Sequence, residues 1–147
     1  MSKIYNKYIE LKSESNYQEN TLYLFKSGLF FIFIDKDAQI ISPILNLKLG
    51  MLNDTIVKCG FPVQSLQKYL NLMKNTPYHI EIVSFENKTP ISTNQYLYYE
   101  NMKAIIDEIL HTNVDTLSIS QAFDFLYNIQ SKLSALSKEY LENEAKE

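Results

Sequence analysis

The feature that most constrains the fold is a pair of apolar runs joined by one short polar turn, in the segment Leu22–Phe33 (LYLFKSGLFFIF). Residues 21–25 and 29–34 have the β-branched and aromatic content of strands. Lys26-Ser27-Gly28 separates them, and glycine there permits the tight turn of a hairpin. The second run is apolar on both faces, so we expect it to lie in the middle of its sheet.

Strand-like and helical segments alternate along the first 84 residues, which is typical of an α/β (α+β) domain with a mixed sheet flanked by helices. Ile4, Tyr8 and Leu11 recur at helical spacing and predict a helix over 2–15. The other expected elements are a helix over 35–45 capped by Asp35, strands over 47–49 and 55–59, a helix from Pro62 to about residue 75 and a strand over 78–83.

The stretch Asn87–Ser92 (NKTPIS) is the best candidate for a boundary, and beyond it the periodicity is purely helical. Capping-box spacings at Ser92/Gln95 and Ser118/Gln121 predict two helix starts. The expected organisation is an α/β domain over 1–86, a linker over 87–93, a two-helix segment over 94–140 and a frayed acidic tail over 141–147.

Charge divides the chain in two. Residues 1–90 contain 10 lysines and 8 acidic residues, whereas residues 91–147 contain 4 lysines and 9 acidic residues. The first part could therefore meet a phosphate backbone, which would repel the second part. All 14 basic residues are lysine, which lacks the rigid fork that reads guanine, so direct base readout is not expected. An AT-rich genome would account for the lysine excess equally well.

The composition argues against several other classes of protein. No run approaches the roughly 20 apolar residues that span a bilayer, and the charged N-terminus does not resemble a signal peptide, so we expect a cytoplasmic protein without membrane contact. His79 and His111 stand alone in sequence, which predicts no metal site. Cys59 lacks a paired histidine and is expected to be a buried structural cysteine rather than a nucleophile. We expect neither an enzyme nor a bound cofactor.

Three short motifs come in the order of a known domain: Tyr8-Ile9-Glu10-Leu11-Lys12, Gly28-Leu29-Phe30-Phe31-Ile32 and Cys59-Gly60-Phe61-Pro62. Over roughly residues 5–84 the chain thus resembles the mismatch-recognition domain at the N-terminus of MutS. That family carries a Gly-x-Phe-Tyr-Glu motif whose phenylalanine wedges into DNA. The resemblance implies a mismatch-repair-related protein that binds double-stranded DNA.

The resemblance assigns the wedge to Phe30 and a phosphate anchor to the turn at Lys26, Ser27 and Gly28; Lys36 and Lys58 are further candidates for phosphate contacts. Two other interpretations stay open, because Phe30 could be a core residue and the lysines could be a solvated surface. Ile32 replaces the family's glutamate, which hydrogen-bonds the mismatched base, and isoleucine offers neither donor nor acceptor. Weak or shape-dependent binding is the expected result.

Ser118, Gln121-Ala122 and Phe125-Leu126-Tyr127 follow the pattern of a helix start and of a later Leu-Tyr pair in another part of MutS. Over residues 105–136 the chain thus resembles the C-terminal helices of MutS, which pack across that family's dimer interface. Phe123, Leu126, Tyr127 and Gln130 are the candidate interaction surface. No GxxxxGK[ST] loop is present, and with three glycines in the chain we expect no nucleotide binding or ATP hydrolysis. Two hypotheses result: a MutS-like DNA-binding protein without an ATPase, or an interaction module that does not bind DNA and pairs with itself or with full-length MutS.

Overall fold

A computed structural model describes residues 2–85 and 89–146; Asn87 and Lys88, which belong to the expected linker, lie outside this range. The chain forms two compact units, Met1–Thr93 and Asn94–Glu147. No helix among the described residues is long and apolar enough to span a bilayer.

The first unit is built on a six-stranded mixed sheet with the order β3-β4-β2-β1-β5-β6. The strands are β1 (Thr21–Ser27), β2 (Phe30–Ile34), β3 (Gly50–Met51), β4 (Val57–Pro62), β5 (His79–Val83) and β6 (Ile91–Ser92). Strands β1 and β5 are parallel and the other neighbours are antiparallel. The expected hairpin and the central place of its second strand are both confirmed, because β2 lies between β1 and β4.

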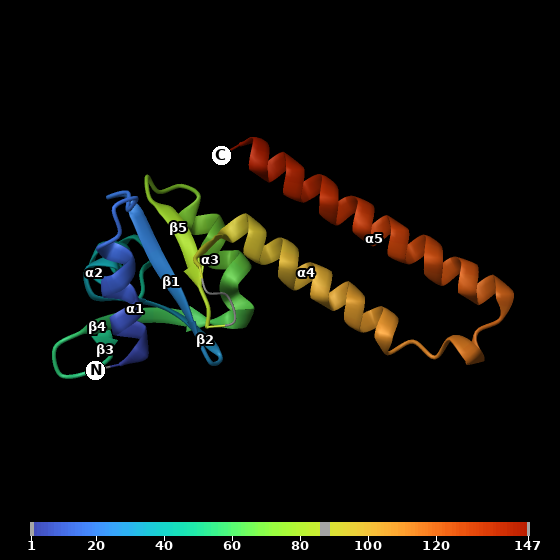
Figure 1. The fold of residues 1–147 in the computed structure, drawn as a ribbon, viewed down its shortest axis with the longest axis horizontal. Helices are drawn as coiled ribbons and strands as arrows, with labels where there is room; N and C mark the ends of the chain where they lie inside the picture. Colours follow the sequence, from blue (N-terminus) through green and yellow to red (C-terminus); the bar gives the residue numbers. More distant parts are fainter. Residues whose placement is uncertain (1, 86–88, 147) are drawn as a thin grey trace. The chain divides into compact units, whose positions relative to one another are not determined.

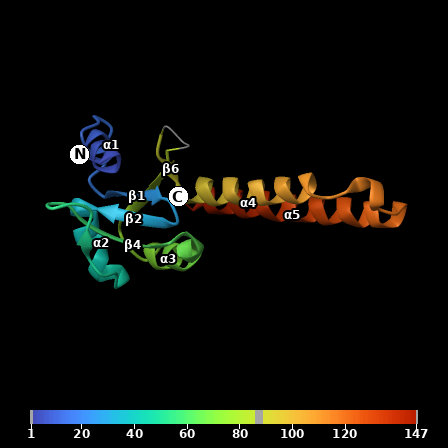
Figure 2. The same cartoon turned by 90° about the horizontal axis from the view of Figure 1, so that it is seen from below.

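Helices cover both faces of this sheet. Figure 2 shows α1 (Lys3–Lys12) on one side, with α2 (Asp35–Leu45) and α3 (Leu66–Met73) on the other. A short 3₁₀ turn, η1 (Val63–Ser65), precedes α3. The α/β class with a mixed sheet is therefore confirmed.

Two strands lie later in the chain than the sequence indicates. The expected strand over 47–49 is found at β3, and β4 runs through Pro62 instead of ending at Cys59. Asn46 adopts a left-handed conformation (φ 54°) that ends α2, and the side-chain oxygen of Asn53 accepts hydrogen bonds from the backbone N–H groups of Thr55 and Ile56. These two turns lie at the start of the expected strands over 47–49 and 55–59. The observed strands β3 and β4 therefore begin further along the chain.

The expected cap of α2 is also wrong. Ile34 is the N-cap residue, without a side-chain bond, and Asp35 lies inside the first turn at φ 51°. Asp37, in the same turn of α2, accepts hydrogen bonds from Lys12 Nζ (2.8 Å) and from the backbone N–H of Tyr23 (2.9 Å). Asp37 thus joins α2 to both α1 and β1.

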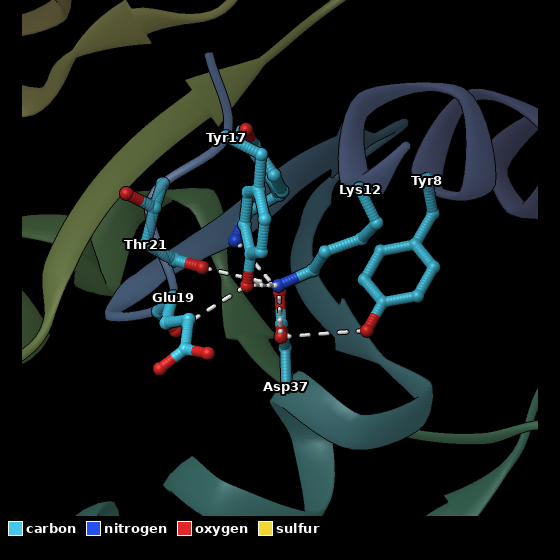
Figure 3. Close-up of polar contacts among 7 residues, drawn as sticks. Tyr8, Lys12, Tyr17, Glu19, Thr21 and Asp37 are labelled. Atoms are coloured by element: carbon cyan, nitrogen blue, oxygen red, sulfur yellow. Dashed lines mark hydrogen bonds and ion pairs between the residues drawn. The ribbon is translucent and has the colours of Figure 1, made fainter. Parts of the chain in front are cut away.

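Figure 3 shows the cluster around this ion pair. Lys12 Nζ also donates to Tyr17 Oη (2.9 Å) and to the carbonyl oxygen of Thr21 (3.1 Å), while Tyr8 Oη donates to Asp37 (3.4 Å). Burial raises the pKa of Asp37, and its bonds to Lys12 and Tyr23 oppose that rise. Because the carboxylate is fully enclosed yet paired, the cluster fixes the packing of α1 on the sheet.

The second unit is an antiparallel pair of helices, α4 (Thr93–Leu110) and α5 (Ile119–Ala145), joined through η2 (Val114–Thr116) (Figure 1). The capping box of Ser118 and Gln121 is confirmed at the start of α5. The core between the helices is small; it contains Ile105, Ile129 and Leu136, with Tyr98, Met102, Phe125 and Leu133 packed against them.

Helix α5 continues to Ala145, over residues for which the sequence predicted a frayed tail. Asn94 explains this, because its side-chain N–H group donates to the carbonyl oxygen of Tyr140 (3.0 Å) and to the Glu144 carboxylate (2.8 Å). The rings of Tyr98 and Tyr140 also pack against each other at a tilt, with centroids 4.6 Å apart.

Candidate nucleic-acid interface

The turn between β1 and β2 is short and held on both sides. Ser27 pairs with Phe30, so only Gly28 and Leu29 form the loop, and Gly28 has φ +60°. Glycine with positive φ at the first central position fits a type II′ turn. On the other side, the backbone N–H of Val63 donates to the carbonyl oxygen of Leu29 (2.9 Å). The turn is therefore held by the residue that follows β4 as well as by its own hairpin.

This turn presents two apolar side chains to solvent. Phe30 is 51% exposed and Leu29 is 75% exposed. The next residues of β2 are different, because Phe31 and Phe33 are buried toward α2 and α3, where Phe31 packs on Phe61 with ring centroids 5.8 Å apart. The core interpretation thus holds for Phe31 and Phe33, while Phe30 lies outside the core.

Ile32, at the position of the family's glutamate, is a core residue. It is 7% exposed and belongs to the apolar cluster between the sheet and α1 that includes Tyr8, Leu11 and Phe25. Because strand side chains alternate between faces, Ile32 and Phe30 lie on the same face of β2. The structure thus offers no polar side chain at this position.

The structure does not gather the candidate lysines around Phe30. Lys26 pairs with Phe31, so it projects from the face opposite to Phe30. Lys58 pairs with Ile34 at the other end of β2, and Lys36 lies in the first turn of α2 just beyond that end. At roughly 3.3 Å per residue, the length of β2 separates both lysines from Phe30 by about 13 Å or more.

Two residues that the sequence did not single out lie at the same end of the sheet as Phe30. Val83 pairs with Phe25 in the parallel register, so Phe85 follows β5 close to the level of Ser27. Phe85 is 47% exposed, and Lys3 Nζ lies 4.4 Å from the centroid of its ring. The sequence would have indicated the position of Phe85 only if the parallel pairing of β1 and β5 had been known.

Two further candidates for chemistry were Cys59 and a metal site. Cys59 is buried, its thiol donates to the carbonyl oxygen of Ala38 (3.8 Å), and burial raises its pKa to about 11. Within residues 2–85 and 89–146, no three His, Cys, Asp or Glu side chains are grouped to hold a metal ion.

The four interaction candidates on α5 are all exposed. Phe123, Leu126 and Tyr127 each expose more than half of their surface, and Gln130 is exposed beside them. They lie away from the small core formed by Ile129 and its neighbours.

Fold and site together define an α/β domain that carries an exposed aromatic turn at one end of a mixed sheet. The chain belongs to the MutS domain I family, whose model matches residues 2–108. It is thus related to the mismatch-recognition module of MutS. The match ends within α4, so it gives no support to the resemblance of residues 105–136 to the C-terminal helices of MutS. No curated protein matches the chain.

Proposed function

We propose that this protein binds double-stranded DNA weakly, with Phe30 as a wedge between base pairs. The observation that carries the proposal is the half-exposed Phe30 ring on a turn held by two neighbouring strands. Apolar wedges of this kind unstack a base step and bend the duplex. A braced turn suits that role because little ordering cost arises on binding.

Lysines would supply the phosphate contacts. Lys26 lies in the strand leading to the turn, and Lys3 lies at the same end of the sheet beside Phe85. Lys36 and Lys58 remain candidates for contacts with DNA phosphates further from the turn. Few contacts of this kind give modest affinity that falls with added salt. The proposed binding requires neither ATP hydrolysis nor any enzymatic step.

Discrimination between mismatched and matched DNA is expected to be small. Ile32 cannot hydrogen-bond a base, and it is buried rather than presented at the turn. Any preference for a mismatch would come from the lower cost of unstacking a mismatched step.

Fluorescence anisotropy with a labelled heteroduplex and its matched homoduplex, at low and physiological salt, tests the proposal. We expect Phe30→Ala to weaken binding by about tenfold, because base stacking contributes about 1–3 kcal/mol. Ile44→Ala is the matched control, since Ile44 is comparably exposed on α2. Equal binding by wild type and Phe30→Ala would refute the wedge.

A second candidate function is protein interaction through α4 and α5. The observation that favours it is the exposure of Phe123, Leu126 and Tyr127 on a unit that DNA would repel. The partner could be a second copy of the chain or full-length MutS. Binding of the labelled chain to purified MutS, compared with self-association, separates these partners.

A further inference from the structure

The helical unit exposes more large apolar side chains than its core buries. The core contains three buried side chains, Ile105, Ile129 and Leu136. Ten large apolar side chains of the same unit are exposed: Tyr99, Ile106, Ile109, Leu110, Val114, Ile119, Phe123, Leu126, Tyr127 and Leu141. A two-helix unit of this kind needs additional burial to be stable on its own.

On α5 three of the exposed apolar residues form one stripe. Ile119, Phe123 and Leu126 follow one another at spacings of four and three residues. At 3.6 residues per turn this stripe lies about 100° around the helix from the buried stripe that contains Ile129 and Leu136.

Helix α4 carries a matching stripe. Tyr99, Ile106 and Leu110 lie about 100° from Ile105, in the same rotational sense as on α5. The helices are antiparallel (Figure 1) and face each other through their buried stripes. Equal rotations of the same sense therefore place both exposed stripes on the same broad side of the pair. We call the six residues of the two stripes the apolar face.

The opposite broad side has a different character. A shallow pocket there is lined by small and polar residues of both helices, including Ala104, Glu108, Lys132 and Glu139. The Lys132–Glu108 ion pair (2.7 Å) connects the helices on that side. The presence of residues from both helices in this pocket supports the assignment of the two stripes to the other side.

Charge also separates the two sides. The unit has four lysines and nine carboxylates in its sequence, a net charge of −5. By the same helical spacing, Glu144 is the one carboxylate of the described helices on the side of the stripes; it lies at the end of α5, where it accepts a hydrogen bond from Asn94 (2.8 Å), and Lys103 lies at the margin of the face. Two such faces could therefore meet without placing like charges opposite each other.

We infer that the apolar face is a self-association surface, and that two copies of the chain pair through it as a four-helix bundle. The six large side chains of the apolar face, which are about half to four-fifths exposed, provide on the order of 700 Å² per copy, which is close to the roughly 800 Å² per partner of a specific interface. An isologous pairing buries the same stripe on both copies. This inference rests on the second candidate function and is independent of DNA binding.

Sedimentation velocity over a range of protein concentrations tests the pairing. Wild type is expected to be dimeric, and Leu126→Glu should weaken dimerisation by at least about tenfold because it places a charge in the buried centre. Asn128→Glu is the matched control, because Asn128 is exposed on the opposite side of α5 and should leave the dimer intact. Phe123→Lys is a second disrupting variant, because Phe123 belongs to the apolar face and its side chain is more than half exposed.

Added salt gives an independent test. The net charge of −5 on each unit opposes pairing, so screening should strengthen the dimer. Wild type that is monomeric at the highest soluble concentration would overturn the inference, as would equal effects of Leu126→Glu and Asn128→Glu. If wild type were monomeric but bound purified MutS, self-association would be refuted and the interaction role of the helical unit would stand. If wild type bound neither itself nor MutS, both the self-association and the interaction role would be refuted.

Discussion

Ile32 and Gly60 face each other on neighbouring strands, and the isoleucine side chain fills the space that the glycine leaves empty. A Cβ atom on Gly60 would lie 2.8 Å from Ile32 Cγ2 and would collide with the carbonyl oxygen of Phe31. The residue that departs from the family motif is thus packed against a site where only glycine fits. Ile32 therefore has a structural role and is not placed to read a mismatched base.

Gly60→Ala should lower the free energy of unfolding by about 1–3 kcal/mol, because β2 and β4 must separate to admit the new methyl group. Chemical denaturation measures this change. Gly50→Ala is the control, since a Cβ there meets no atom within 4 Å. Equal stability of the two variants would contradict the close packing of Ile32 on Gly60.

Ile32→Glu restores the family's residue type but should not create a mismatch-specific protein. The new carboxylate would enter the apolar cluster with Tyr8 and Phe25, where an unpaired charge costs about 3–5 kcal/mol. We expect a large loss of stability in denaturation and no gain in the ratio of heteroduplex to homoduplex affinity. A stable variant with a clear heteroduplex preference would show that this position can reach the DNA.

Lys12→Met tests the cluster beneath α1. The substitution keeps most of the aliphatic stem but leaves the buried Asp37 carboxylate without its cation, so unfolding should become easier by about 3–5 kcal/mol. Lys7→Met removes a partly exposed ion pair with Glu10 and should cost less than about 1 kcal/mol. Similar melting temperatures for the two variants would argue against a dominant role for the Lys12–Asp37 pair.

The protein should lose stability in alkaline solution. Burial raises the pKa of Cys59 to about 11 and that of Tyr23 to about 12, and burial also raises the pKa of Tyr8. The unfolded chain therefore gives up these protons at lower pH than the folded chain, and the free energy of unfolding falls as pH rises above about 9. Cys59 alone accounts for about 2 kcal/mol at pH 11. Denaturation of Cys59→Ala from pH 8 to 11 should show a shallower fall than wild type; equal slopes would contradict the assignment.

Local features were predictable from the sequence, whereas contacts between distant segments were not. The hairpin around Gly28 and the capping box of Ser118 depend on neighbouring residues, and both are confirmed. The Lys12–Asp37 pair joins residues 25 positions apart, so no local pattern predicts it. The pairing of Lys3 with Phe85 likewise depends on the parallel register of β1 and β5, which no local pattern encodes.

The wedge is tested most directly by the fluorescence of 2-aminopurine placed at a mismatched step, since this base brightens when it is unstacked. We predict that wild type raises the fluorescence at saturating protein, and that Phe30→Ala bound to the same duplex does not. Ile44→Ala should behave as wild type, because Ile44 lies on α2 away from the turn. A rise of equal size with Phe30→Ala would contradict the account, because the base would then be unstacked without the Phe30 ring.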